Sequence, residues 1–126
     1  KANYLIKKGI ISDNAPYFNL FLGNLGTAPM DPASFAAMYC LLPENAVWSV
    51  GGIGRYQLDA NIMGLCYGGN VRVGIEDNLY FDRNKKILAS NAMLVERVVK
   101  IIKKLGLTVA TPYEARVILH LNNSDQ

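Results

Sequence analysis

Apolar and polar side chains alternate in the middle of the chain. Three β-branched residues occupy every second position there: Val71, Val73 and Ile75. Arg72 and Glu76 fall on the opposite face, and a period of two is typical of a β-strand with two different faces. The pattern predicts a strand in which both charged side chains face one cavity while the three apolar side chains pack on helices.

Glu76 and the following Asp77 would lie at the carboxyl end of this strand. In parallel α/β folds, that end of the sheet is where ligands bind. Burying charged side chains costs free energy, and a functional site explains that cost. The alternative is an edge strand on which Arg72 and Glu76 form a solvated ion pair that adds little stability.

Strands and helices alternate along the rest of the chain. Short apolar runs predict further strands, and longer runs with helical periodicity and capping residues predict helices. The expected strands are residues 16–23, 46–50, 71–76 and 107–110, and the expected helices are residues 2–8, 33–42, 56–67, 90–105 and 112–121. In the first strand, Phe18, Leu20 and Leu22 should share one face.

Two of these helices have specific start signals. Asp31 followed by Pro32 suits an N-cap and the first helical position. Thr111, Pro112 and Glu114 form a capping box, so we interpret Thr111 and Glu114 as structural residues rather than catalytic ones. The helix at residues 90–105 has Ser90 or Asn91 as its cap.

Four strand-helix units at this spacing indicate a parallel α/β fold. We expect a single domain over residues 1–126, built as half of a (β/α)₈ barrel, with residues 122–126 forming a disordered tail. Residues 51–55 form a glycine-rich turn before a helix. The alternative is therefore a non-catalytic, doubly wound module that binds an anionic ligand through its glycine-rich turns.

Composition narrows the class of protein. The chain has 126 residues, 51% of them apolar, and a net charge of +3, which suits one core of modest size. The basic residues lie mainly around one helix, so we expect a solvated face and no binding of nucleic acid. We find no apolar run long enough to span a membrane and no signal-peptide pattern, so we expect no membrane association and a cytoplasmic location.

Several motifs together resemble one enzyme family. They are Gly-Ile-Gly-Arg at 52–55, Gly-Gly-Asn-Val-Arg-Val-Gly-Ile-Glu-Asp-Asn-Leu at 68–79, Ala-Ser-Asn-Ala at 89–92 and Ala-Thr-Pro-Tyr-Glu-Ala-Arg at 110–116. The chain resembles the carboxyl-terminal half of the β-keto acid cleavage enzymes, which include the 3-keto-5-aminohexanoate cleavage enzymes of lysine fermentation. The resemblance implies a zinc-dependent (β/α)₈ barrel that converts a β-keto acid and acetyl-CoA into acetoacetate and a new acyl-CoA.

The resemblance also implies roles for three residues. It makes Glu76 a zinc ligand, Asp77 the general base, and Arg72 the partner that orients Asp77 and keeps it ionised. The family's other zinc ligands are a pair of histidines in the amino-terminal half, and this chain does not supply them. We therefore expect the chain to associate with a missing amino-terminal half or with a second copy of itself.

Overall fold

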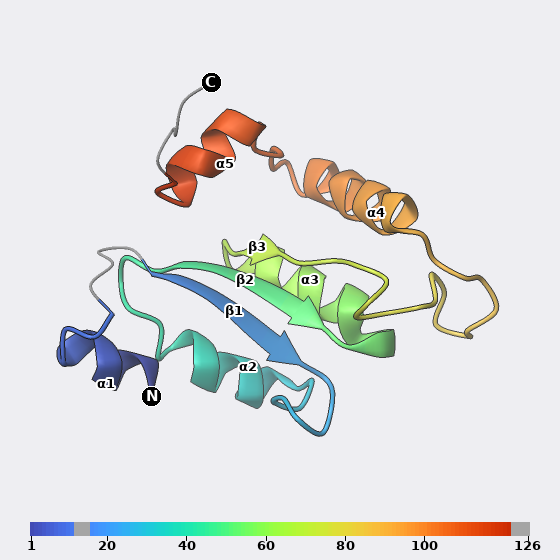
Figure 1. The fold of residues 1–126 in the computed structure, drawn as a ribbon. Coiled ribbons are helices and arrows are strands. Elements are labelled where there is room, and N and C mark those ends of the chain that lie inside the picture. The colour runs from blue at the N-terminus through green and yellow to red at the C-terminus, as the bar shows by residue number, and fades with distance from the viewer. Residues whose placement is uncertain (12–15, 122–126) are drawn as a thin grey trace.

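The computed structural model describes residues 1–11 and 16–121. Its centre is a parallel sheet of three strands in the order β1-β2-β3, with β1 at Tyr17–Leu22, β2 at Val47–Gly52 and β3 at Asn70–Val71 (Figure 1). Asn19 pairs with Ser49, and Val50 pairs with Val71. The α/β class and the parallel sheet expected from the sequence are confirmed.

The helices fall where the sequence patterns place them. They are α1 (Ala2–Lys7), α2 (Pro32–Tyr39), the 3₁₀ turn η1 (Gly54–Tyr56), α3 (Gln57–Cys66), α4 (Asn91–Lys104) and α5 (Pro112–Ile118). The side chain of Asp31 accepts from the Ser34 amide, and Ser90 accepts from the Met93 amide. The Thr111–Glu114 capping box is also formed. Local capping chemistry is therefore sufficient to locate these helix starts.

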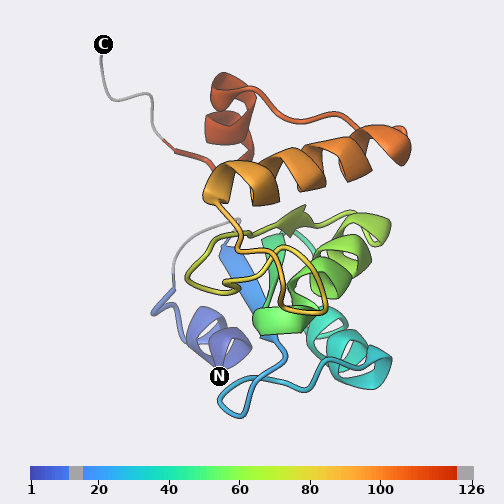
Figure 2. The same ribbon diagram turned by 90° about the vertical axis from the view of Figure 1, so that its right-hand side faces the viewer.

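One face of the sheet forms the main core. Leu20, Leu22, Trp48 and Val50 point to this face and pack with side chains from α2 and α3. Figure 2 shows both helices on that side of the sheet. The expectation that Phe18, Leu20 and Leu22 share a face is confirmed.

The second core lies where α4 covers α3. Val98 and Ile102 of α4 pack against Leu65, with Val71 and Val73 beside them. Ile75 does not pack in this core, and its side chain is 39% exposed. The apolar side of the predicted central strand is therefore only partly used for packing.

Two of the expected strands differ from the structure: the central strand is shorter than predicted, and the strand expected at residues 107–110 is not formed. Regular pairing of the central strand ends at Val71, and residues 75–77 form a turn. Residues 107–110 are exposed and form no strand, because among the described residues they have no neighbouring strand to pair with. The described sheet therefore has three strands instead of four.

The sheet order bears on the alternative fold. A doubly wound sheet reverses its strand order at the ligand site, whereas the three described strands follow one another without reversal. Within residues 1–11 and 16–121, no helix is both long and apolar enough to cross a membrane. The tail expected at 122–126 lies outside the described residues.

Candidate active site

The segments that follow the three strands meet around one cavity. It has a volume of about 630 Å³ and is lined by Gly23 after β1, Ile53 after β2, and Glu76 and Asp77 after β3. All three strands are parallel, so their carboxyl ends lie at the same edge of the sheet. This is the edge at which ligands bind in parallel α/β proteins.

Arg72 joins the two carboxylates of this cavity. Its Nε lies 3.0 Å from Asp77 Oδ2, and its Nη2 lies 3.3 Å from Glu76 Oε1. The hydrogen bond to Asp77 is the main cause of the raised pKa of the Arg72 guanidinium. Arg72 is therefore paired with both carboxylates at the carboxyl end of the sheet. The two carboxylates lie in a turn, however, and not in the strand that the sequence pattern predicted.

The three side chains differ in their access to solvent. Asp77 is 8% exposed, whereas Arg72 is 41% and Glu76 is 58% exposed. Asp77 is thus held by its partner in a buried position, while Glu76 lines the cavity with an exposed side chain. Such an arrangement offers one held carboxylate for proton transfer and one accessible carboxylate for a ligand.

Two buried amide side chains of α3 hold the segment that carries these groups. Gln57 Nε2 donates to the Gly74 carbonyl at 3.0 Å, and Asn61 Nδ2 donates to the carbonyls of Val50 and Arg72 at 3.2 and 3.0 Å. Both side chains are almost completely buried. Neither residue was among those predicted from the sequence, but two amides at i and i+4 on the apolar side of a helix are the signal that could have identified them.

A third amide acts from α4. Asn91 Oδ1 accepts from the Ile75 amide at 3.0 Å, so Asn91 holds the turn while Ser90 caps the helix. The Arg72–Asp77 segment is thereby fixed from two helices. Because these contacts come from outside the segment, they favour a turn where the local pattern favours a strand.

The glycine-rich turn at 51–55 does not present its amides to the cavity as an anion cradle. The amide of Ile53 donates to the Leu22 carbonyl at 2.9 Å, and that of Gly54 donates to the Asp77 carbonyl at 2.6 Å. Gly54 has a φ of +59°, which favours glycine. The turn therefore has a structural role, because it ties η1 to the Asp77 segment.

The open face of the sheet carries a small polar network. Tyr17 Oη donates to Ser49 Oγ at 2.6 Å, and Ser49 Oγ donates to Asn19 Oδ1 at 3.0 Å. On the same face, the Arg72 guanidinium lies over the ring of Phe21. Asn19, Ser49 and Arg72 therefore lie on one side of the sheet.

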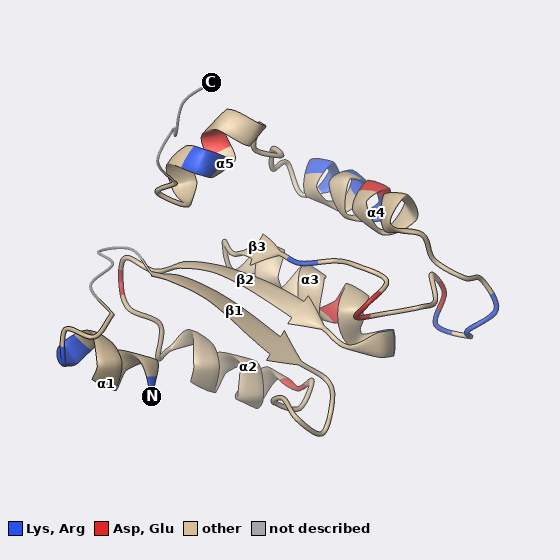
Figure 3. Ribbon diagram, in the orientation of Figure 1, with Lys and Arg blue, Asp and Glu red and all other residues tan. Residues whose placement is uncertain are grey.

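A basic surface lies beside the site. Figure 3 shows Lys and Arg residues gathered on α4 and in the loop after β3. In that loop, Asp82 accepts backbone hydrogen bonds from Lys86 and Ile87, and the Ile87 bond is the main reason that the pKa of Asp82 is lowered. Arg83 forms an ion pair with Asp59 of α3. These contacts fix the loop as one wall of the cavity.

The chain was compared with known protein families and curated proteins. The model of the beta-keto acid cleavage enzyme family matches residues 1–121. The chain is 53% identical over 81 residues to a 3-keto-5-aminohexanoate cleavage enzyme of Fusobacterium nucleatum, covering 64% of this chain and 29% of that protein. It is 37% identical over 118 residues to the enzyme of the same name from Acetoanaerobium sticklandii, covering 94% and 42%.

A third relative carries a different name. The chain is 38% identical over 120 residues to a 3-dehydrocarnitine:acetyl-CoA trimethylamine transferase of Rhizobium meliloti, covering 95% of this chain and 39% of that protein. Across these three relatives, the chain spans between 29% and 42% of their length. Because the family model matches nearly the whole sequence, the chain belongs to the beta-keto acid cleavage enzyme family.

Proposed function

We propose that this chain forms part of an enzyme that transfers an acyl group from a β-keto acid to coenzyme A. In this reaction, C2 of the β-keto acid forms a bond to the acetyl carbonyl carbon of acetyl-CoA as the acetyl C–S bond breaks. The bond between C2 and C3 of the β-keto acid then breaks as C3 bonds to the sulfur of the released coenzyme A. The products are acetoacetate and a new acyl-CoA. Relatives named as acetyl-CoA transferases and as cleavage enzymes support this reaction class.

The Arg72–Asp77 pair at the carboxyl edge of the sheet is the observation that carries the proposal. Asp77 acts as the base that removes a proton from C2 of the β-keto acid, because its carboxylate is buried, oriented and close to the cavity. Arg72 is a positioning residue that fixes the direction of the Asp77 carboxylate. Removing a well-placed general base costs about 10²–10⁴-fold in rate.

Glu76 is proposed to contribute one ligand to a zinc ion. Carboxylate oxygens bind zinc, and the Glu76 side chain is accessible at the cavity. No group of three or more His, Cys, Asp or Glu side chains that could hold a metal ion occurs in the described part of the chain. A catalytic zinc needs three protein ligands, so the remaining ligands would come from the rest of the enzyme, and the bound metal would polarise the keto group.

We propose that the three strands are part of a (β/α)₈ barrel that the rest of the enzyme completes. The polar network of Tyr17, Asn19 and Ser49 would then face the barrel interior, since it lies on the side of the sheet opposite the α2 and α3 core. The curated relatives are more than twice as long as this chain, which leaves room for the missing strands.

The test uses the full-length enzyme with acetyl-CoA and a panel of β-keto acids that includes 3-keto-5-aminohexanoate. We expect acetoacetate to form and Asp77→Asn to lower kcat by about 10²–10⁴-fold. Glu76→Gln should lower zinc content, whereas Glu44→Gln, an exposed carboxylate on the loop before β2, is the matched control. Full activity of the Asp77→Asn enzyme would disprove the assignment of the base.

A further inference from the structure

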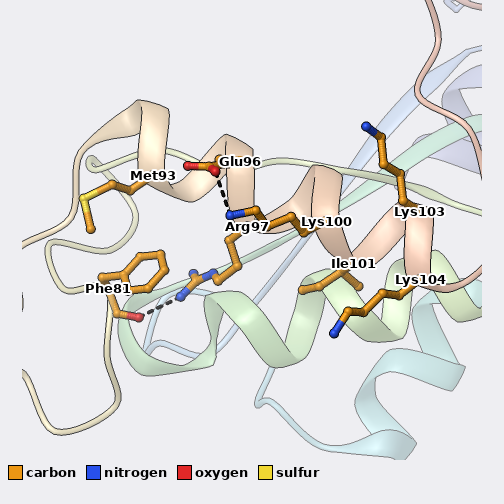
Figure 4. A pocket seen from close by; sticks show the side chains of 8 residues that line it. All are labelled: Phe81, Met93, Glu96, Arg97, Lys100, Ile101, Lys103 and Lys104. Atoms are coloured by element: carbon orange, nitrogen blue, oxygen red, sulfur yellow. Dashed lines mark hydrogen bonds and ion pairs between the residues drawn. The ribbon is translucent and has the colours of Figure 1, made fainter.

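A second hollow lies along α4, next to the proposed active site. It has a volume of about 530 Å³ and contains four cations and one carboxylate: Arg97, Lys100, Lys103, Lys104 and Glu96. Glu96 is paired with Lys100 at 2.7 Å. Figure 4 shows Lys104 on the side of the helix that carries Arg97, whereas Lys103 points to the opposite side. The hollow is therefore strongly basic even after its one ion pair is counted.

Arg97 is the residue of this hollow whose hydrogen-bond donors are not all paired within the described part of the chain. Its Nη1 donates to the Phe81 carbonyl at 2.7 Å, and its guanidinium lies 4.7 Å from the centre of the Phe81 ring. Its Nε and Nη2 are buried and have no hydrogen-bond partner among the described residues. Buried guanidinium donors without acceptors cost free energy, and the charge of a nearby anion would offset part of that cost.

The floor of the hollow is apolar. Phe81, Met93 and Ile101 line it beside the cations (Figure 4). A site that joins an aromatic ring and aliphatic side chains to cations suits a ligand with both a flat ring system and phosphate groups. Simple inorganic anions would not use the apolar floor.

The hollow and the active-site cavity are neighbours. A narrow gap of about 20 Å³ between them is lined by Phe81 and Arg97 of the hollow and by Asn78 and Tyr80 of the cavity. Adjacent residues line the two, Tyr80 the cavity and Phe81 the hollow. Because both hollows are open and adjoin at residues 80 and 81, a long ligand that passes over this segment can place one end near Asp77 and the other end beside α4.

We infer that this hollow binds the phosphate-bearing nucleotide end of acetyl-CoA. The inference rests on the proposed function for the identity of the ligand. Acetyl-CoA has a reactive thioester at one end and an adenosine group with three phosphates at the other, so the two neighbouring sites match its two ends. Lys104 contacts the phosphates, Lys100 and Arg97 add positive charge beside them, and the apolar floor receives the adenine.

The test measures binding of adenosine 3′,5′-bisphosphate and of inorganic phosphate to the full-length enzyme by calorimetry. The main variant is Lys100→Gln with Lys104→Gln, since both side chains are exposed and their loss should not disturb the fold. Its control is Lys7→Gln with Lys8→Gln, which removes the same charge from α1. We expect the main variant to weaken bisphosphate binding about tenfold or more, because charge-assisted phosphate contacts are lost, and the control to bind normally.

Kinetics give the second readout. The main variant should raise KM for acetyl-CoA about tenfold while KM for the β-keto acid changes less than twofold. Equal bisphosphate binding by the wild type and the main variant would overturn the inference, and so would inorganic phosphate binding as tight as that of the bisphosphate. If no β-keto acid is turned over, the proposed function fails, but the bisphosphate titration still decides whether the hollow is an anion site.

Discussion

The guanidinium of Arg72 lies 4.8 Å from the centre of the Phe21 ring, across the strand that separates them in the sheet. Phe21 is on β1 and pairs with Gly51 of β2, and Arg72 follows β3. A Cβ at Gly51 would lie 3.0 Å from the Phe21 ring. The absence of a side chain at Gly51 therefore leaves room for the ring that supports Arg72.

Replacing Phe21 should remove the aromatic ring that helps to position the Arg72 guanidinium. We expect Phe21→Leu to lower kcat of the full-length enzyme about two- to fivefold, because a cation–π contact at an exposed site is worth about 0.5–1 kcal/mol. Phe21→Tyr should restore the rate, since it keeps the aromatic face. Steady-state kinetics check this, and a Phe21→Tyr enzyme as slow as Phe21→Leu would contradict the positioning role.

The two glycines at the end of β2 should respond differently to alanine. A Cβ at Gly52 would lie 2.5 Å from the Tyr56 carbonyl oxygen and 2.7 Å from the Ala60 Cβ. Gly52→Ala must push α3 away from the sheet, so we expect it to lower the free energy of unfolding by about 1–3 kcal/mol. Gly51→Ala should cost less, because the Phe21 side chain can move. Urea unfolding of both variants gives the comparison, and equal losses would argue against this packing.

Asn61 should be the main anchor of the segment that carries Arg72. Asn61→Leu removes two hydrogen bonds to the carbonyls of Val50 and Arg72. We expect a loss of about 1–3 kcal/mol in unfolding free energy, because the Arg72 carbonyl would lose its side-chain donor, whereas the Val50 carbonyl keeps the bond from the Arg72 amide. Ile62→Ala, on the more exposed side of α3, is the control. If the control costs as much as Asn61→Leu, the anchor has been assigned to the wrong residue.

The loop that forms one wall of the cavity should loosen in acid. The pKa of Asp82 is lowered because its carboxylate accepts the amides of Ile87 and Lys86. Since the pKa in the folded loop lies below that in the unfolded chain, the stabilisation is present above about pH 3.9 and is lost as the pH falls through the folded-state value. Asp82→Asn should speed amide exchange at both residues at neutral pH, and unchanged exchange would exclude this role.

Sequence patterns were sufficient for elements that depend on local chemistry. The caps at Asp31, Ser90 and Thr111 depend on side chains within three residues of the helix start, so they could be predicted directly. The face shared by Leu20 and Leu22 follows from the strand period alone. In both cases, the information lies within the segment itself.

Elements that depend on distant contacts could not be predicted in the same way. The alternation from Val71 to Glu76 favours a strand, but Gln57, Asn61 and Asn91 hold this segment as an extended piece followed by a turn. Residues 107–110 have the composition of a strand but pair with no described neighbour. For the site, the sequence predicted that Arg72 pairs with Asp77, but it did not predict the contact of Arg72 with Phe21. Phe21 lies two strands away in the sheet, so the residues around Arg72 in the sequence do not indicate this contact.

The central claim is that this chain carries the base of an acyl-transfer reaction between a β-keto acid and acetyl-CoA. The most direct test follows acetyl-CoA labelled with ¹³C in both acetyl carbons by NMR, using the full-length enzyme and a turned-over β-keto acid. The account predicts label at C3 and C4 of acetoacetate, unlabelled acyl carbons in the new thioester, and loss of both products in Asp77→Asn. Label that remains in acetyl-CoA or appears as free acetate, or equal labelling of acetoacetate by the Asp77→Asn enzyme, would contradict it.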